Sequence, residues 1–219
     1  IMKYINNKFF IEGKNIRSLT KKFNTPLYCY SYKNLRGNIE NFKKVFKEIR
    51  PLICFSVKSN SNISLLKEIK KLGLGADVVS KGELYASLKA GINKNKIVFS
   101  GVGKTRDEIE YAIKQKILLI NSESLSEVLA IEAAAKKLNK VVDIGLRLNP
   151  DTDAETLKQI STGKSENKFG VDKKTFVKII NLMKQSKFIN IKCLSVHIGS
   201  QILNPVSYTH LTLPTRYRV

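Results

Sequence analysis

The chain has 219 residues, of which 42% are hydrophobic, and its formal net charge is +21. This length suffices for one domain with a sizeable core, no stretch approaches the roughly 20 consecutive apolar residues of a membrane span, and no N-terminal signal peptide is visible. The basic residues are mostly lysines that occur singly or in pairs, whereas nucleic-acid sites favour clustered arginines with stacking aromatics. We therefore expect a cytoplasmic protein with neither a membrane nor a nucleic acid as partner.

The three cysteines predict neither a disulfide framework nor a metal site. Cys29, Cys54 and Cys193 are an odd number, lie far apart and form no Cys-x-x-Cys pair. This usage is typical of reduced thiols in a cytoplasm. With only His197 and His210 to join them, a zinc-type ligand set is not expected.

The first 50 residues predict short elements in a fixed order. An apolar segment at 9–11 precedes a helix-like stretch at 18–23, which the proline at position 26 brings to an end. Residues 27–30 have the composition of a strand. A serine at position 31 is placed to cap a helix that runs to about residue 49, with apolar residues at helical spacing.

From residue 53 onward a strand-and-helix unit repeats. Amphipathic segments separate the apolar strand candidates, and they include capping-box patterns at Thr105–Glu108 and Ser124–Glu127. This alternation predicts βα units and a parallel sheet. The strand candidates begin near Ile53, Ala76, Ile97, Leu118, Val141 and Ile191.

The position of the polar residues favours a (β/α)₈ barrel over a doubly wound sheet. They follow several different strands, as in a barrel site, whereas a doubly wound sheet concentrates its site at one switch point. These residues are Lys58, Asp77, Ser100 with Gly101, Arg147 with Asn149, and 197–200. Since only six βα units are recognised, we expect an incomplete barrel.

The C-terminal segment differs in composition from the rest. Residues 206–219 contain no lysine, asparagine or acidic residue, although lysine and asparagine are frequent up to Pro205. We therefore expect this segment to be a non-native tail. The expected organisation is an N-terminal segment at 1–26, whose strand belongs to a missing C-terminal β-domain, then a partial barrel at 27–205 and the tail at 206–219.

Seven motifs in order resemble the diaminopimelate decarboxylase family, pyridoxal-phosphate enzymes of the alanine racemase-like barrel group. Each motif alone is weak, but the series covers the chain from about residue 4 to Pro205. The motifs are Phe-Ser-Val-Lys-Ser-Asn at 55–60, Gly-Ala-Asp-Val-Val-Ser at 75–80, Val-Phe-Ser-Gly-Val-Gly-Lys-Thr at 98–105, Leu-Arg-Leu-Asn-Pro at 146–150, Ile-Ser-Thr-Gly at 160–163, Glu-Asn-Lys-Phe-Gly at 166–170 and His-Ile-Gly-Ser-Gln at 197–201.

The resemblance implies a role for five residues. Lys58 would form the Schiff base with pyridoxal 5′-phosphate, and partial burial at a strand end would favour its neutral amine. His197 would stack on the pyridine ring, and Ser200 would lie near the phosphate. Asp77 and Arg147 would line the cofactor cavity, paired with one another or with Lys58.

The implied reaction converts meso-2,6-diaminopimelate into L-lysine and CO₂. In the family, a Glu-Pro-Gly-Arg motif supplies the carboxylate for the pyridine nitrogen, and a second subunit supplies a cysteine and a tyrosine. These would lie beyond Pro205, so we expect this chain alone to be inactive and the complete enzyme to be a homodimer. Two alternatives remain: another barrel decarboxylase, acting on ornithine, arginine or carboxynorspermidine, and a non-catalytic pyridoxal-phosphate-binding barrel.

Overall fold

The computed structural model describes residues 2–150, 169–200 and 202. The chain divides into two compact units, residues 1–52 and residues 53–219, and each is described by itself. The motif expected at 160–163, the part of the expected loop at 166–168 and the segment 206–219 lie outside the described residues.

The first unit begins with a small antiparallel sheet in which strands β1, β2 and β3 pair in chain order. A two-residue turn joins β1 to β2, and its residues Asn6 and Asn7 have φ values of 46° and 59°. Asparagine tolerates this left-handed conformation better than most residues, and it suits a tight hairpin. The sequence predicted one apolar segment here, but the hairpin was missed. The bounds are β1 (Met2–Ile5), β2 (Lys8–Ile11) and β3 (Lys14–Asn15).

Two helices follow this sheet, α1 (Ile16–Phe23) and α2 (Tyr32–Val45). The side chains of Asn15 and Ser31 accept hydrogen bonds from backbone N–H groups in the first turns, as N-cap residues do. Both helices were predicted, although α2 ends earlier than residue 49. The strand predicted at 27–30 is wrong, because these residues form no strand. A strand needs a ladder partner as well as suitable residues, and these residues have none among the described residues.

The second unit is built on a parallel sheet. Within the described residues the sheet has six strands, and their order in space is their order in the chain. The prediction of six parallel strands is confirmed, and a helix follows the first five of them within the described residues. The strands are β4 (Cys54–Ser56), β5 (Gly75–Val78), β6 (Ile97–Phe99), β7 (Leu119–Ser122), β8 (Val142–Arg147) and β9 (Ile189–Ser195).

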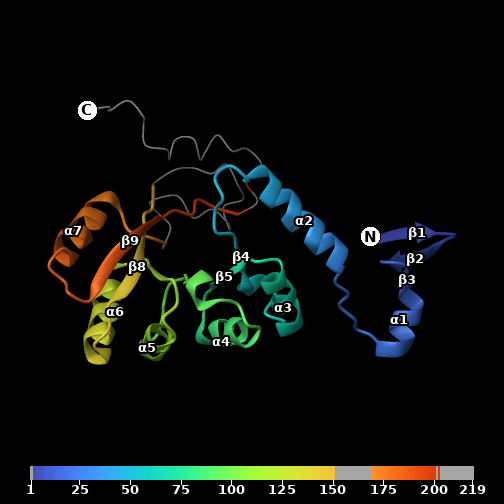
Figure 1. The fold of residues 1–219 in the computed structure, drawn as a ribbon, viewed down its shortest axis with the longest axis horizontal. Coiled ribbons are helices and arrows are strands. Elements are labelled where there is room, and N and C mark those ends of the chain that lie inside the picture. Colours follow the sequence, from blue (N-terminus) through green and yellow to red (C-terminus); the bar gives the residue numbers. More distant parts are fainter. Residues whose placement is uncertain (1, 151–168, 201, 203–219) are drawn as a thin grey trace. The chain divides into compact units, whose positions relative to one another are not determined.

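Helices connect the strands and lie in chain order around one side of the sheet (Figure 1). Gly73, with φ of 78°, follows α3 and ends it as the sequence predicted. The helices are α3 (Ile63–Lys71), α4 (Lys81–Lys89), α5 (Arg106–Gln115), α6 (Leu125–Leu138) and α7 (Lys173–Met183), with short 3₁₀ turns η1 (Val57–Ser59) and η2 (Lys94–Lys96). No helix in the described ranges is long and apolar enough to span a membrane.

Side chains alternate between the two faces of the sheet, as the pleat of a strand requires. One face carries the core under the helices, where the side chains are at most 1% exposed. These residues are Ala76, Val78, Ile97, Phe99, Ile120 and Ile144. The other face carries polar side chains, among them Asp77, Asn121 and Arg147, which are partly exposed. The sheet with its single helical layer is a partial α/β barrel whose inner face is polar at the carboxyl ends of its strands.

Candidate active site

The residues singled out in the sequence lie at the carboxyl edge of the sheet. Lys58 lies in η1 directly after β4, Asp77 lies in β5, and Ser100 follows β6. Arg147 is the last residue of β8, and His197 follows β9 by two residues. Because parallel strands all end at the same edge, residues far apart in sequence lie together there. We call this edge, on the inner face of the partial barrel, the mouth.

A chain of hydrogen bonds crosses three neighbouring strands at this mouth. The hydroxyl of Ser100 donates to the carboxylate of Asp77 at 2.5 Å, and the side-chain amide of Asn121 donates to the Ser100 oxygen at 3.1 Å. Asp77 lies in β5, Ser100 follows β6 and Asn121 lies in β7. The three side chains therefore act as one polar unit on the inner face of the sheet.

Asp77 is a half-buried carboxyl group surrounded by positive charge. Burial raises its pKa, and the hydrogen bond from Ser100 and the nearby charges of Lys58, His197 and Lys104 oppose that rise. Lys58 itself is exposed, so the partial burial predicted for it is not found. Its amine is available to a ligand, with the carboxylate of Asp77 as the neighbouring negative charge.

Arg147 is held by three different groups. Its guanidinium donates to the carboxylate of Glu123 at 3.0 Å and to the backbone oxygen of His197 at 3.3 Å, and it lies over the ring of Phe169 at 5.1 Å. Of the two predicted pairings, that of Arg147 with Asp77 is therefore wrong, whereas the charge of Lys58 does act on Asp77. Glu123 directly follows β7 and is 5% exposed, so it is the nearer and more completely desolvated carboxylate.

His197 has a lowered pKa, first because burial disfavours the imidazolium and then because Arg147 and Lys58 carry like charge. Its side chain still reaches the surface. The imidazole is accordingly neutral at pH 7. Ser200 is exposed and lies in the bend that follows the buried Gly199.

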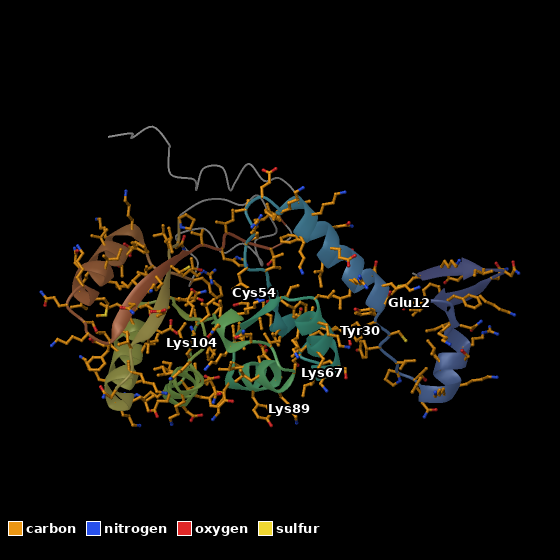
Figure 2. All side chains as sticks on the ribbon, viewed as in Figure 1. Glu12, Tyr30, Cys54, Lys67, Lys89 and Lys104 are labelled. Atoms are coloured by element: carbon orange, nitrogen blue, oxygen red, sulfur yellow. The ribbon has the colours of Figure 1, made fainter. Side chains whose placement is uncertain are left out.

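A second lysine, Lys104, lies beneath the mouth with a very different environment. Its ammonium donates to the backbone oxygens of Gly101 and Asn121 and to the carboxylate of Glu127, the last at 2.8 Å. The Lys104 and Glu127 side chains are 1% and 9% exposed. Since an ammonium has three donors, all of them are used, and Lys104 has a structural role. Figure 2 shows Lys104 within the unit, in contrast to Lys67 and Lys89 on the outer helices α3 and α4.

The ion pair also changes the cap of α6. Ser124 accepts from the backbone N–H of Glu127, as predicted. The reciprocal half of the predicted capping box is absent, because the Glu127 carboxylate binds Lys104 and the backbone N–H of Glu123 instead. The capping box at Thr105 and Glu108 is confirmed in both directions.

Sequence reasoning missed the residues that β7 contributes. It named polar residues after the other strands, but none near position 120. Asn121 and Glu123 follow the apolar run 117–120 in the same way that Lys58 follows its own strand. That placement was a usable signal. The specific partners, Ser100 and Arg147, lie on other strands and were not readable from spacing.

The mouth combines an exposed amine, a half-buried carboxylate, a neutral imidazole and a braced guanidinium. An amine beside a carboxylate can react with a carbonyl carbon, and a neutral imidazole can lie against a flat ring without bringing a full positive charge to it. Among the described residues, no three His, Cys, Asp or Glu side chains gather as metal ligands. The geometry thus fits an organic carbonyl ligand with an anionic group.

Comparison with curated proteins identifies relatives of one name. The chain is 44% identical over 190 residues to diaminopimelate decarboxylase of Helicobacter pylori strain J99, which covers 87% of this chain and 47% of the relative. It is 41% identical over 207 residues to diaminopimelate decarboxylase of Aquifex aeolicus, covering 94% of this chain and 49% of the relative. The chain spans about half the length of these relatives.

Solved structures give the same result for the fold. A crystal structure of diaminopimelate decarboxylase from Helicobacter pylori complexed with L-lysine is 43% identical with a TM-score of 0.84, and the match covers 87% of this chain and 48% of that one. The enzyme from M. jannaschii gives a TM-score of 0.87 at 33% identity, covering 94% and 50%. The predicted fold, part of a pyridoxal-phosphate-binding (β/α)₈ barrel, is confirmed.

The family described as pyridoxal-dependent decarboxylase, pyridoxal binding domain, matches residues 32–213. That range includes every strand of the parallel sheet and every site residue named above. The chain belongs to the pyridoxal-dependent decarboxylase family and contains its pyridoxal-binding domain.

Proposed function

We propose that the protein of which this chain is a part removes the carboxyl group from the D-configured centre of meso-2,6-diaminopimelate, giving L-lysine and CO₂ with pyridoxal 5′-phosphate as cofactor. The observation that carries the proposal is Lys58, an exposed amine next to the Asp77 carboxylate at the mouth of a pyridoxal-binding barrel. The relatives at 41–44% identity are named diaminopimelate decarboxylases, which supports the substrate.

The residues at the mouth fit pyridoxal phosphate in their chemistry. The aldehyde needs an amine, which Lys58 offers. The flat ring needs an uncharged face to pack on, which the lowered pKa of His197 provides. The phosphate needs donors in a turn of small residues, and the bend at Gly199 and Ser200 is such a turn. When bound, the cofactor supplies a ring that accepts the electron pair left by the departing carboxyl group.

Each of the five site residues then has a role in holding the cofactor. Lys58 holds the cofactor covalently through its amine, and Asp77 is the negative charge beside it. His197 packs on the ring, and Ser200 donates to the phosphate. Arg147 lines the cavity and, through Glu123 and the His197 carbonyl, holds the segment after β9 against the end of β8.

The wider organisation belongs to the same proposal. The complete enzyme would be a cytoplasmic homodimer whose second subunit completes the site, and this chain alone would be inactive. Residues 1–26 would associate with a β-domain, residues 27–205 would form the partial barrel, and residues 206–219 would be a non-native tail. The half-length coverage of the relatives supports an incomplete site.

The test uses an extended protein, in which residues 1–205 are joined to the part of the Helicobacter pylori relative that the alignment does not cover. Pyridoxal phosphate is added, the adduct is reduced with borohydride, and the modified lysine is located by mass spectrometry. Lys67→Ala, on an exposed helix, is the matched control for Lys58→Ala. We expect modification at position 58 in the control and none there in Lys58→Ala.

Release of CO₂ is then measured with diaminopimelate, ornithine, arginine and carboxynorspermidine. We expect turnover of diaminopimelate to exceed the others. Faster turnover of another amino acid would reassign the substrate. Cofactor binding at Lys58 without turnover of any of the four would show a non-catalytic binding protein. A structure of arginine decarboxylase from Paramecium bursaria Chlorella virus, at 22% identity and a TM-score of 0.72, shares the fold alone.

A further inference from the structure

The hydrogen-bond chain through Asp77, Ser100 and Asn121 has a fixed direction. The Ser100 oxygen accepts from the Asn121 amide nitrogen, and the serine has one proton to donate. That proton goes to the Asp77 carboxylate. If the Asn121 amide were rotated by half a turn, its oxygen would face Ser100 and compete with Asp77 for that proton. The orientation of Asn121 therefore keeps the Ser100 hydroxyl directed at Asp77.

This orientation leaves the amide oxygen of Asn121 buried and without a hydrogen-bond partner among the described residues. An unpaired buried oxygen is unfavourable and calls for a reason. The neighbouring strand also makes room for it, because a Cβ atom at Gly145 would lie 2.0 Å from that oxygen. Two unusual features thus accompany this orientation of the Asn121 amide: its buried oxygen has no partner, and the facing residue, Gly145, has no side chain.

The titratable groups that face Asp77 come from four parts of the unit. Lys58 comes from η1, Cys54 from β4, Lys104 from the segment after β6, and His197 from the segment after β9. Lys104 is saturated by its own partners, and the pKa of Cys54 is raised to about 11, chiefly by burial, so the thiol stays neutral. Lys58 is the exposed cation that the Asp77 charge can act on.

We propose that Ser100 and Asn121 are positioning residues, which keep the Asp77 carboxylate oriented and ionised beside Lys58, so that the pH dependence of carbonyl-cofactor binding at that lysine follows the ionisation of Asp77. Ser100 acts on Asp77 directly, and Asn121 acts through Ser100. The inference rests on the proposed function only in the identity of the cofactor. The part that concerns the Asp77 carboxyl stands on the hydrogen bonds alone.

The first test measures the carboxyl group of Asp77 without any cofactor. The extended protein is labelled with ¹³C at the aspartate carboxyl carbons, and the Asp77 signal is assigned with Asp77→Asn and followed against pH by NMR. Ser100→Ala is expected to raise the pKa of Asp77 by about one pH unit, because the hydrogen bond that favours the ionised carboxylate is lost. Asn121→Ala is expected to raise it less, since the Ser100 hydroxyl remains but is no longer oriented.

Ser122→Ala is the matched control. Ser122 neighbours Asn121 in β7 and is fully buried on the opposite face, and its hydroxyl has no hydrogen-bond partner among the described residues. We expect it to leave the Asp77 titration unchanged. If Ser100→Ala does not fold, Ser100→Thr and Ser100→Val replace it, since the two differ only in the hydroxyl. Equal titrations of Asp77 in Thr and Val, or in Ser100→Ala and wild type, would overturn the inference.

The second test measures pyridoxal 5′-phosphate binding by absorbance across the same pH range. The pH profile of binding is expected to shift in Ser100→Ala together with the pKa of Asp77, and to return to that of wild type in Ser100→Thr. A binding profile that stays as in wild type while the Asp77 titration moves would overturn the inference. If wild type does not bind the cofactor at Lys58, the proposed function fails, while the Asp77 titration still decides whether Ser100 and Asn121 hold the carboxyl.

Discussion

Lys58 and Lys104 follow two strands of the same sheet, β4 and β6, yet their surroundings are opposite. Lys104 is buried, and its ammonium is bound by two backbone oxygens and the Glu127 carboxylate. Lys58 is exposed, and within the described residues it forms no ion pair, although the Asp77 charge is close enough to act on it. A saturated lysine stabilises the fold, whereas an exposed lysine beside an incompletely neutralised carboxylate is available for chemistry.

The comparison shows that position at a strand end does not by itself define a catalytic group. Both lysines lie in motifs that begin in an apolar strand and continue into the segment after it, at 55–60 and 98–105. What separates them is whether other strands supply acceptors. Four substitutions test this difference, and their expected effects decrease in the order given.

Replacing Lys58 with Ala is expected to have the largest effect. Activity of the extended protein should fall at least about a thousand-fold, since the attacking amine is lost, while the free energy of unfolding should change by less than about 0.5 kcal/mol because the side chain is exposed. CO₂ release and urea denaturation measure the two quantities. A variant that keeps substantial activity would remove Lys58 from the mechanism, and one that unfolds would assign it a structural role.

Replacing Lys104 with Met should instead lower the free energy of unfolding. The substitution keeps the length of the side chain but leaves the Glu127 carboxylate buried without its cation, which costs about 3–5 kcal/mol. Urea denaturation measures the loss. Lys67→Met, on the exposed side of α3, is the control and should change stability by less than about 0.5 kcal/mol. Equal stability of the two variants would contradict the structural role of Lys104.

Replacing Arg147 with Met should cost less, about 2 kcal/mol, because the Arg147 side chain is 12% exposed and that of Lys104 only 1%, so water can enter the space that the guanidinium leaves. The Glu123 side chain itself is 3% exposed, so its carboxylate depends on that water or on Arg147. The double variant Arg147→Met with Glu123→Gln should regain part of the loss. No recovery in that double variant, measured by denaturation, would show that Arg147 acts mainly through Phe169 or the His197 carbonyl.

Replacing Asp77 with Asn should have the smallest effect on stability of the four, and it should be stabilising at pH 7. Burial raises the pKa of Asp77 in the folded state, so folding favours the protonated carboxyl. The stability that this gives is present below the unfolded value of about 3.8 and is lost as the pH rises through the higher folded value. The advantage of Asp77→Asn in Tm should therefore be present at pH 7 and absent near pH 3.8. A variant that melts lower than wild type at pH 7 would mean that the Asp77 charge stabilises the fold.

Much of the fold was predictable because each βα unit carries sequence signals within a few consecutive residues. Apolar runs, caps such as Thr105 with Glu108, and the glycine at position 73 each depend on a few consecutive residues. The strand predicted at 27–30 failed because a strand depends on a partner that the sequence does not reveal. The hairpin at Asn6 and Asn7 was missed because a turn of two asparagines is a weaker signal than one with glycine.

The site was predictable in position but not in pairing. The strand-end rule found Lys58, Asp77, Arg147 and His197, whereas it overlooked the residues after β7. Arg147 pairs with Glu123 and not with Asp77, because the two candidate carboxylates differ in burial and distance, and these are properties of the assembled sheet. The cofactor roles of the five predicted residues remain predictions, with the reduction and titration experiments as their tests.

The order of the strands in the sheet has a consequence for synthesis. Since β4 to β9 neighbour one another in the order in which they occur in the chain, each new strand finds its partner already made. A nascent chain that has left the ribosome as far as Asn139 can pair β4 through β7 and close the Asp77, Ser100 and Asn121 network before Arg147 emerges. Folding during synthesis generally starts from the N-terminal part of a chain. Translation can thus assemble this mouth strand by strand, from Lys58 toward His197.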